Sequence, residues 1–127
     1  MTTPKPVVAI VDDDPRMLES VQDLLESSGY MARTYASAPA LLAVGLAGID
    51  VLVADIGMPG MDGFALAETS RRLRPDLPVF LITGRHELME DERVRTADRL
   101  FRKPFDATDL LLAVEQAVSS SEAGRQK

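Results

Sequence analysis

Apolar residues gather in short runs along the chain, and the segments between the runs are amphipathic. Three runs, at residues 7–11, 51–55 and 77–82, are almost continuously apolar, which is typical of strands buried on both faces of a parallel sheet. Two weaker runs, at residues 30–35 and 99–102, predict a short strand and an edge strand. The chain is therefore expected to contain five strands.

Between the strands, apolar residues recur at three- and four-residue spacing, which predicts amphipathic helices. Asp14 before Pro15 marks the start of the first helix, and Ser37 marks the start of the second. The apolar residues expected on the inner faces of the helices are Leu18, Val21, Leu24, Leu25, Leu41, Leu42, Leu46, Phe64, Leu66, Ala67, Leu73, Leu110, Leu111, Val114 and Val118.

The C-terminal third of the chain has a less regular pattern. Residues 85–98 are mostly charged and offer only a thin apolar face. They predict a short or disordered fourth helix, because little apolar area is available to hold it. Asp106 or Thr108 is expected to cap the last helix. The domain is expected to span residues 1–120, followed by a flexible polar tail at 121–127.

The predicted elements alternate between strand and helix five times within 127 residues. Such alternation predicts an α/β fold, in which helices cover both faces of a parallel sheet through right-handed crossovers. A single domain of this length favours the flavodoxin-like, doubly wound strand order 2-1-3-4-5.

The composition excludes several classes of function. A formal net charge of -6 argues against a nucleic-acid-binding surface, because phosphate contacts need clustered lysine and arginine. With no cysteine and one histidine, His86, the chain has no thiolate chemistry, disulfide or multi-histidine metal site. No apolar run approaches the roughly 20 residues that span a bilayer, and residues 1–6 lack the core of a signal peptide. We therefore expect a cytoplasmic protein without membrane contact.

Polar side chains follow the buried strands at the sheet edge where open α/β folds bind their ligands. Asp12 and Asp13 follow the first strand, Asp55 ends the third, and Thr83 and Lys103 follow the fourth and fifth. In the predicted order the first and third strands are neighbours, so their carboxylates are expected to converge. Like charges repel unless a cation neutralises them, and Mg²⁺ prefers such oxygen ligands.

Each of these residues also has a simpler interpretation when it is taken alone. Asp55 is as well explained as a turn cap, Thr83 as a strand-end turn residue and Lys103 as a solvated charge. Asp14 is expected only to cap a helix. Their joint placement favours a site, because a carboxylate beside Mg²⁺, with a lysine and a hydroxyl nearby, can act as a nucleophile toward phosphorus.

Over nearly its whole length, the chain resembles the CheY-like receiver domain of two-component response regulators. The matching stretches are Asp12-Asp13 after residues 8–11, Asp55 with residues 58–63, Thr83-Gly84, and Lys103-Pro104-Phe105. The three consecutive aspartates and residues 82–84 are most similar to the FixJ-type branch of that family.

The resemblance implies a function in a phosphorelay. Asp55 would accept a phosphoryl group from a phosphohistidine on a histidine kinase or a histidine phosphotransfer protein. Asp13 and Asp55 would bind Mg²⁺ directly, together with the backbone carbonyl of Gly57, and Asp12 would act through water. The domain would then signal to a downstream protein effector, without contacting nucleic acid itself.

The resemblance also implies roles for the remaining polar residues of the edge. Lys103 would pair with the phosphoryl oxygens, and Thr83 would hydrogen-bond to one of them after transfer. The Lys103-Pro104 peptide bond is expected to be cis. The domain would take part in its own phosphorylation and dephosphorylation without being an enzyme that turns over a substrate.

Three features depart from the usual pattern of the family. Leu100 stands where an aromatic residue is usual, and Phe101 beside it is expected on the opposite face of the strand. We therefore predict an altered or weaker coupling of phosphorylation to output. The interval between the threonine and lysine motifs is shorter than in FixJ-type receivers. Gly57 and Arg85 occupy positions that modulate the access of water and phosphodonor.

The leading interpretation is a single-domain response regulator that signals through protein contacts. The alternatives are a receiver fragment of a longer DNA-binding transcriptional regulator and a pseudo-receiver that works without phosphate. A Mg²⁺-dependent phosphatase with an aspartyl-phosphate intermediate is disfavoured, because Gly57 stands where such enzymes need a second acid.

Overall fold

Five parallel strands form one sheet in the computed structural model, which describes residues 5–84, 92–93 and 97–125. The strands are β1 (Val7–Val11), β2 (Met31–Tyr35), β3 (Val51–Asp55), β4 (Val79–Thr83) and β5 (Arg99–Arg102). They lie in the order β2-β1-β3-β4-β5, and every neighbouring pair is parallel. This confirms the predicted doubly wound α/β topology.

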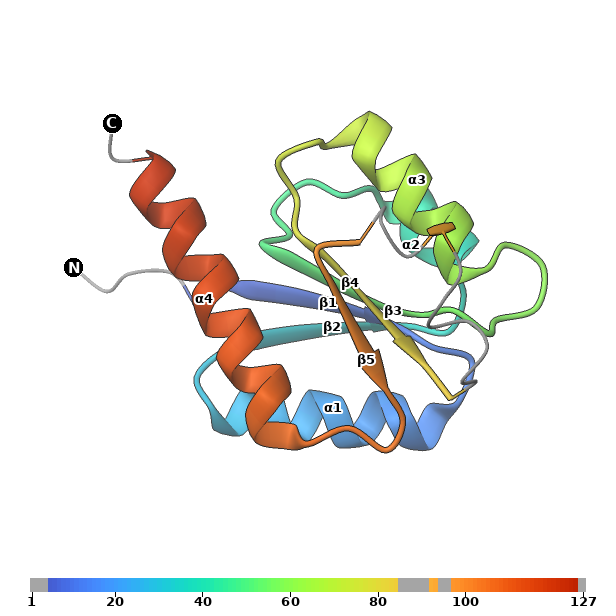
Figure 1. The fold of residues 1–127 in the computed structure, drawn as a ribbon, viewed down its shortest axis with the longest axis horizontal. Coiled ribbons are helices and arrows are strands. Elements are labelled where there is room, and N and C mark those ends of the chain that lie inside the picture. Colours follow the sequence, from blue (N-terminus) through green and yellow to red (C-terminus); the bar gives the residue numbers. More distant parts are fainter. Residues whose placement is uncertain (1–4, 85–91, 94–96, 126–127) are drawn as a thin grey trace.

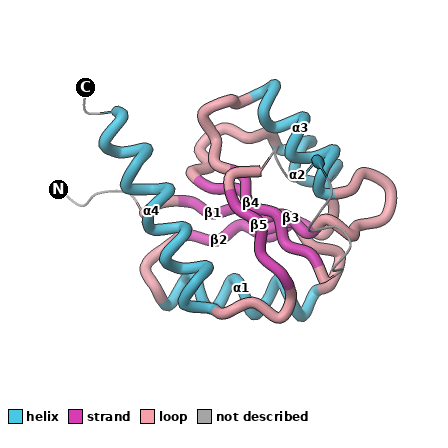
Figure 2. Tube along the Cα trace, in the orientation of Figure 1, coloured by secondary structure: helices cyan, strands magenta, loops and turns pink. Residues whose placement is uncertain are grey.

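Helices cover both faces of the sheet (Figure 1). They are α1 (Pro15–Ser27), α2 (Ala38–Val44), α3 (Gly63–Leu73) and α4 (Ala107–Arg125). The helices α1 and α4 lie on one face, and α2 and α3 lie on the other, as Figure 2 also shows. None of the helices in the described part of the chain has the length and apolar character that crossing a membrane requires.

The core is divided by the sheet into two layers. Strand residues alternate between the layers, so Val8 and Ile10 pack with α1 and α4, whereas Ala9 and Val11 pack with α2 and α3. All residues of β1, β3 and β4 are buried. This explains why these three strands are continuously apolar in the sequence.

The helix starts are capped as predicted. The Asp14 carboxylate accepts a hydrogen bond of 2.9 Å from the Arg16 N–H, and Pro15 is the first helical residue. Ser37 caps α2 in the same way. For α4 the capping side chain is Asp106 rather than Thr108, because its carboxylate accepts a 2.7 Å bond from the Thr108 N–H.

Several predicted boundaries and faces are wrong in detail. Leu73 was expected to be buried but is 62% exposed, and it is the last residue of α3. The fourth strand begins at Val79 and includes Thr83, whereas Leu77 lies in a turn closed by a bond from its N–H to the Arg74 carbonyl. The second helix ends at Val44, so Leu46 is buried in a loop.

The last helix is longer than predicted. It continues to residue 125, into the segment 121–127 that the sequence predicted to be a flexible polar tail. Glu122, Ala123 and Arg125 favour helix by intrinsic propensity, although Ser121 and Gly124 do not. The domain boundary at residue 120 and the flexibility of the end of the chain stay predictions.

The predicted fourth helix lies mostly outside the described residues, since only positions 92–93 and 97–98 of that segment are described. Its short or disordered character therefore stays a prediction, and so does the role of Arg85.

The side chain of Arg74 ties α3 to the loop before β3. Its Nη1 donates hydrogen bonds of 2.9 and 2.7 Å to the carbonyls of Leu46 and Ile49, and its Nη2 bonds to Asp76 at 2.9 Å. The Arg74 side chain is mostly buried in these contacts. Removing it would leave two partly buried carbonyls without their charged donor.

Arg74→Ala is therefore expected to lower the free energy of unfolding by about 2 kcal/mol in urea denaturation. The matched control is Arg72→Ala, which removes only an exposed ion pair with Glu68 at 3.5 Å. That variant should stay within about 0.5 kcal/mol of the parent protein. Equal losses in the two variants would contradict the role given to the Arg74 hydrogen bonds.

Candidate functional site

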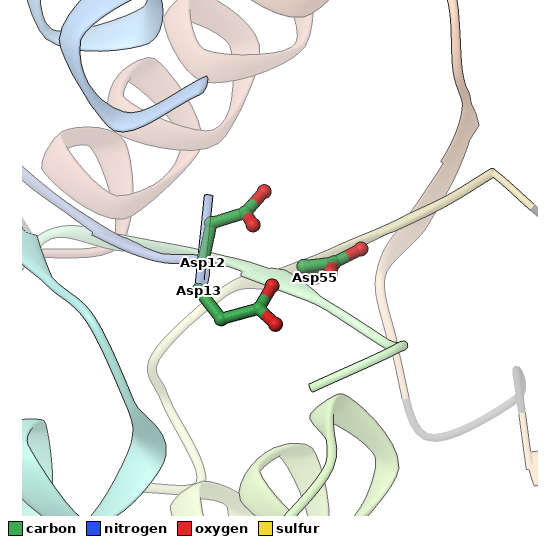
Figure 3. A group of neighbouring side chains, drawn as sticks. All are labelled: Asp12, Asp13 and Asp55. Carbon is green, nitrogen blue, oxygen red and sulfur yellow. The ribbon is translucent and has the colours of Figure 1, made fainter. Parts of the chain in front are cut away.

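Three carboxylates meet where β1 and β3 end. In the register of this pair Val11 lies opposite Ala54, so Asp12 follows beside Asp55. One carboxylate oxygen from each of Asp12, Asp13 and Asp55 lies within 4.8 Å of the other two, and Figure 3 shows the three side chains gathered at one place. Asp12 and Asp55 are buried, whereas Asp13 is exposed. The predicted convergence is thus present in the structure.

Lys103 brings a positive charge to this acidic group. Its Nζ lies 3.4 Å from the Asp12 Oδ2 and 3.4 Å from the Asp55 Oδ1. The Lys103 N–H donates a 2.7 Å bond to the Thr83 carbonyl, which places the residue just beyond the end of the β4–β5 pairing. The bond between Lys103 and Pro104 is cis, as predicted.

The remaining predicted residues lie at the same edge. Thr83 is buried and ends β4, the strand between β3 and β5. Gly57 lies two residues after Asp55, and a Cβ added to it would be 3.9 Å from the Asp55 Oδ2. The backbone at Gly57 therefore passes beside the Asp55 carboxylate. Asp14 takes part through its N–H, which donates a 2.9 Å bond to the Asp12 Oδ1.

Burial and charge change the acid–base properties of the site. Burial raises the pKa of Asp12, and the negative charge of Asp55 adds to this effect; the Asp14 N–H and Lys103 oppose it only in part. Burial by itself lowers the pKa of Lys103, but Asp55 and Asp12 more than reverse this, so its pKa lies above the usual value. Lys103 is therefore a permanent cation at this edge.

The donor set fits a hard divalent cation. Among the residues that the structure describes, one ammonium group lies beside these three carboxylates, which leaves negative charge uncompensated. The side chains that converge offer oxygen ligands only, which Mg²⁺ prefers, and the exposed Asp13 leaves the site open on one side. The raised pKa of Asp12 agrees with a place where added positive charge would be stabilising.

Asp12→Asn is expected to raise the melting temperature by a few degrees in metal-free buffer at neutral pH. The folded pKa of Asp12 lies above its ordinary value of 3.8, so the folded state binds this proton more readily than the unfolded chain. The carboxylate therefore lowers stability as the pH rises above 3.8, and the loss is complete above the folded pKa. The advantage of the variant should shrink on acidification and vanish below the ordinary pKa.

Thermal unfolding across this pH range measures the effect, with the exposed Asp23→Asn as a control for surface charge. A lower melting temperature for Asp12→Asn at neutral pH would contradict the account of the acidic cluster.

The sequence pattern did not predict one of the residues that pack against the site. Gly63, the first residue of α3, packs directly on the backbone of the phospho-acceptor candidate: a Cβ at this position would lie 2.6 Å from the Asp55 carbonyl oxygen. Its N–H donates a 3.2 Å bond to the Ile56 carbonyl. The sequence signal was the Asp62-Gly63 pair before the helix, which by itself indicated only a turn.

Leu100 and Phe101 lie on opposite faces of β5, as predicted. Leu100 packs against the layer that contains α2 and α3, whereas Phe101 is buried in the layer that contains α1 and α4. The Phe101 ring therefore does not occupy the place left without an aromatic residue at Leu100.

A five-stranded sheet in this order, with acids, a threonine and a lysine at its carboxyl edge, is the arrangement of a receiver domain. Residues 8–115 match the family described as response regulator receiver domain, and the chain belongs to that family.

Individual relatives and solved structures support the same family assignment. The chain is 36% identical over 116 residues to the C4-dicarboxylate transport transcriptional regulatory protein DctD of Rhizobium meliloti, covering 88% of this chain and 25% of DctD. It is 36% identical over 121 residues to the heme response regulator HssR of Staphylococcus haemolyticus, covering 92% of this chain and 53% of HssR. The chain thus spans about a quarter to a half of these relatives.

Two solved structures show the same fold. A CheY-like receiver domain protein from Methanospirillum hungatei superposes with a TM-score of 0.87 at 28% identity, covering 95% of this chain and 99% of that one. The response regulator TrrA from Thermotoga maritima, solved in complex with Mg²⁺–BeF, gives a TM-score of 0.80 at 25% identity, covering 88% and 98%. These matches do not distinguish the FixJ-type branch, which stays a prediction.

Proposed function

We propose that Asp55 is the phospho-acceptor of this receiver domain and that its phosphorylation is the signal passed on in a phosphorelay. The observation that carries the proposal is the buried Asp55 carboxylate, which shares a cluster with Asp12 and Asp13 and lies 3.4 Å from the Lys103 ammonium. The Lys103 ammonium holds the Asp55 carboxylate in place electrostatically, and the exposed Asp13 keeps one side of the cluster in contact with solvent.

The transfer is a displacement at phosphorus. A carboxylate oxygen of Asp55 forms the new bond to the phosphorus atom of a phosphohistidine while the phosphorus–nitrogen bond breaks. The electron pair of that bond remains on the imidazole nitrogen, which takes up a proton. The product is an acyl phosphate on Asp55 and a free histidine on the partner.

Asp13 and Asp55, with the backbone carbonyl of Gly57, would hold Mg²⁺, and Asp12 would contact it through water. The complex of the related TrrA with Mg²⁺–BeF supports this assignment. When bound, the ion supplies positive charge to the transferring oxygens. Asp12 in turn is oriented by the Asp14 N–H, which leaves its other oxygen directed toward Lys103.

Lys103 and Thr83 complete the chemistry. The Lys103 ammonium, already between two carboxylates, would pair with the phosphoryl oxygens as negative charge builds up on them. Thr83 ends the neighbouring strand at the same edge and would donate a hydrogen bond to the phosphoryl group after transfer.

The partners follow from this chemistry. The donor would be a histidine kinase or a histidine phosphotransfer protein in the cytoplasm, and the output would be contact with a protein effector. The domain itself would not contact nucleic acid, in keeping with its formal net charge of -6. It acts as a phospho-acceptor that affects its own phosphorylation and dephosphorylation, rather than as an enzyme with a separate substrate.

A second candidate is that the domain controls a linked output region of a longer transcriptional regulator. The observation that favours it is the relative DctD, a transcriptional regulatory protein of which the chain spans 25%. In that case the contact made by the phosphorylated domain would be within its own polypeptide.

The test is to incubate the protein with acetyl phosphate and Mg²⁺ and to measure its intact mass. One added phosphoryl group, lost on treatment with hydroxylamine and absent when EDTA is present, would support an Mg²⁺-dependent acyl phosphate. No adduct would favour a pseudo-receiver, and repeated turnover of unrelated phosphoesters would favour a phosphatase.

A further inference from the structure

Three phenylalanine rings lie in contact next to the site, in the layer between the sheet and the helices α1 and α4. The ring centroids of Phe80 and Phe101 are 5.8 Å apart, and those of Phe101 and Phe105 are 6.3 Å apart. Both pairs are inclined by about 60°, within the range in which aromatic rings attract one another. We call these residues the three-ring cluster.

Two residues of the three-ring cluster flank Lys103 in the sequence. Phe101 precedes Lys103 by two residues and Phe105 follows it by two. The chain bends at residues 103–104, and the 6.3 Å contact between the Phe101 and Phe105 rings spans this bend. The Phe101–Phe105 contact therefore closes a short arc with Lys103 at its middle.

Both ends of this arc are anchored. Phe101 is 7% exposed and packs on Phe80, a buried residue of β4. Phe105 is partly buried against the same core layer as Leu110 of α4. The Lys103 N–H is held by the Thr83 carbonyl at 2.7 Å. Little freedom remains for the backbone that carries the ammonium group.

We propose that the three-ring cluster positions Lys103: the contact between Phe101 and Phe105 holds the turn after β5 so that the Lys103 ammonium lies between the carboxylates of Asp12 and Asp55. This inference rests on the proposed function of Asp55. Phe101 and Phe105 are positioning residues, because they act on the reacting groups only through Lys103.

The position of Lys103 has two consequences of opposite sign. The ammonium helps phosphoryl transfer, because it is aimed at the charge that develops on the phosphoryl oxygens. It also competes with a metal ion, because it already partly neutralises Asp12 and Asp55. A displaced Lys103 should therefore slow the transfer and, at the same time, strengthen the binding of Mg²⁺.

Phe101→Leu and Phe105→Leu test this directly, since leucine keeps an apolar side chain but loses the ring contact. At saturating Mg²⁺, phosphorylation of Asp55 by acetyl phosphate should slow by about tenfold. The apparent affinity for Mg²⁺, measured by amide NMR titration, should rise by about threefold. Lys103→Ala should shift both quantities in the same directions and further.

Two controls separate positioning from general loss of stability. Phe105→Tyr keeps the ring, with room for its hydroxyl because Phe105 is only partly buried, and should retain most of the rate. Leu25→Val removes volume from the same core layer on α1, at the opposite edge of the sheet, and should change neither rate nor Mg²⁺ affinity.

An unchanged rate in the two leucine variants would overturn the inference. So would a slower rate with unchanged or weaker Mg²⁺ binding, which is expected if the whole site merely loosens. If the wild-type protein gains no phosphoryl group on Asp55, the proposed function fails, but the Mg²⁺ titration still tests where Phe101 and Phe105 place Lys103.

Discussion

Asp55→Asn is expected to abolish phosphorylation by acetyl phosphate, with a loss of at least about 10³-fold in rate. Asparagine has almost the same shape as aspartate and fits the buried position, but its amide is not a nucleophile toward phosphorus. The substitution also removes one of the two carboxylates that lie 3.4 Å from Lys103. A phosphate-affinity gel and intact-mass measurement would show the loss.

The matched control is Asp14→Asn, at the same edge of the sheet. The Asp14 side chain caps α1 through the Arg16 N–H, and asparagine caps helices equally well. The part of Asp14 that touches the site is its backbone N–H, which the substitution keeps. This variant should be phosphorylated like the wild type. Undiminished labelling of Asp55→Asn would move the acceptor to Asp12 or Asp13.

Gly63→Ala is expected to lower the free energy of unfolding by about 3 kcal/mol. The added Cβ would lie 2.6 Å from the Asp55 carbonyl oxygen and 2.8 Å from the Ile56 Cα. Both atoms belong to the backbone of a buried strand and its continuation, so they cannot move aside as a flexible side chain would. The loss should appear although alanine otherwise favours a helix over glycine by about 1 kcal/mol.

Gly57→Ala provides the comparison in urea denaturation. Among the described residues, the atom nearest to a Cβ at Gly57 is the Asp55 Oδ2, at 3.9 Å, which is an ordinary contact. The stability of this variant should stay within about 0.5 kcal/mol of the wild type. A similar loss in both variants would show that the close approach of α3 to Asp55 is not what Gly63 provides.

Asp55 has close neighbours from two elements, with Gly63 packed on its backbone and Lys103 beside its carboxylate. On one side, α3 presses against the peptide that follows Asp55. On the other, Lys103 reaches across from the strand beyond β4. Both contacts come from neighbouring elements, α3 and the turn after β5.

Much of the fold could be predicted because its causes are local. The alternation of buried strands and amphipathic segments determined the α/β class, and Asp14, Pro15 and Ser37 determined where two helices begin. Predictions failed where burial or helix length depends on more than the local sequence pattern. Leu73 continues the apolar pattern of α3, but as the last residue of the helix it is exposed. The polar residues after Ser119 show no apolar pattern, yet the backbone continues as helix.

The sequence by itself determined which residues stand at the carboxyl ends of the strands, because parallel strands in a doubly wound sheet open on one edge. It thereby predicted the acids, the threonine and the lysine of the candidate site. Only the tertiary structure decided the distances, such as the 3.4 Å between Lys103 and Asp12, residues 91 positions apart. It also decided that Gly63 presses on Asp55 and that Phe101 reaches Phe105. Such contacts depend on the packing of several elements at once, which no local pattern contains.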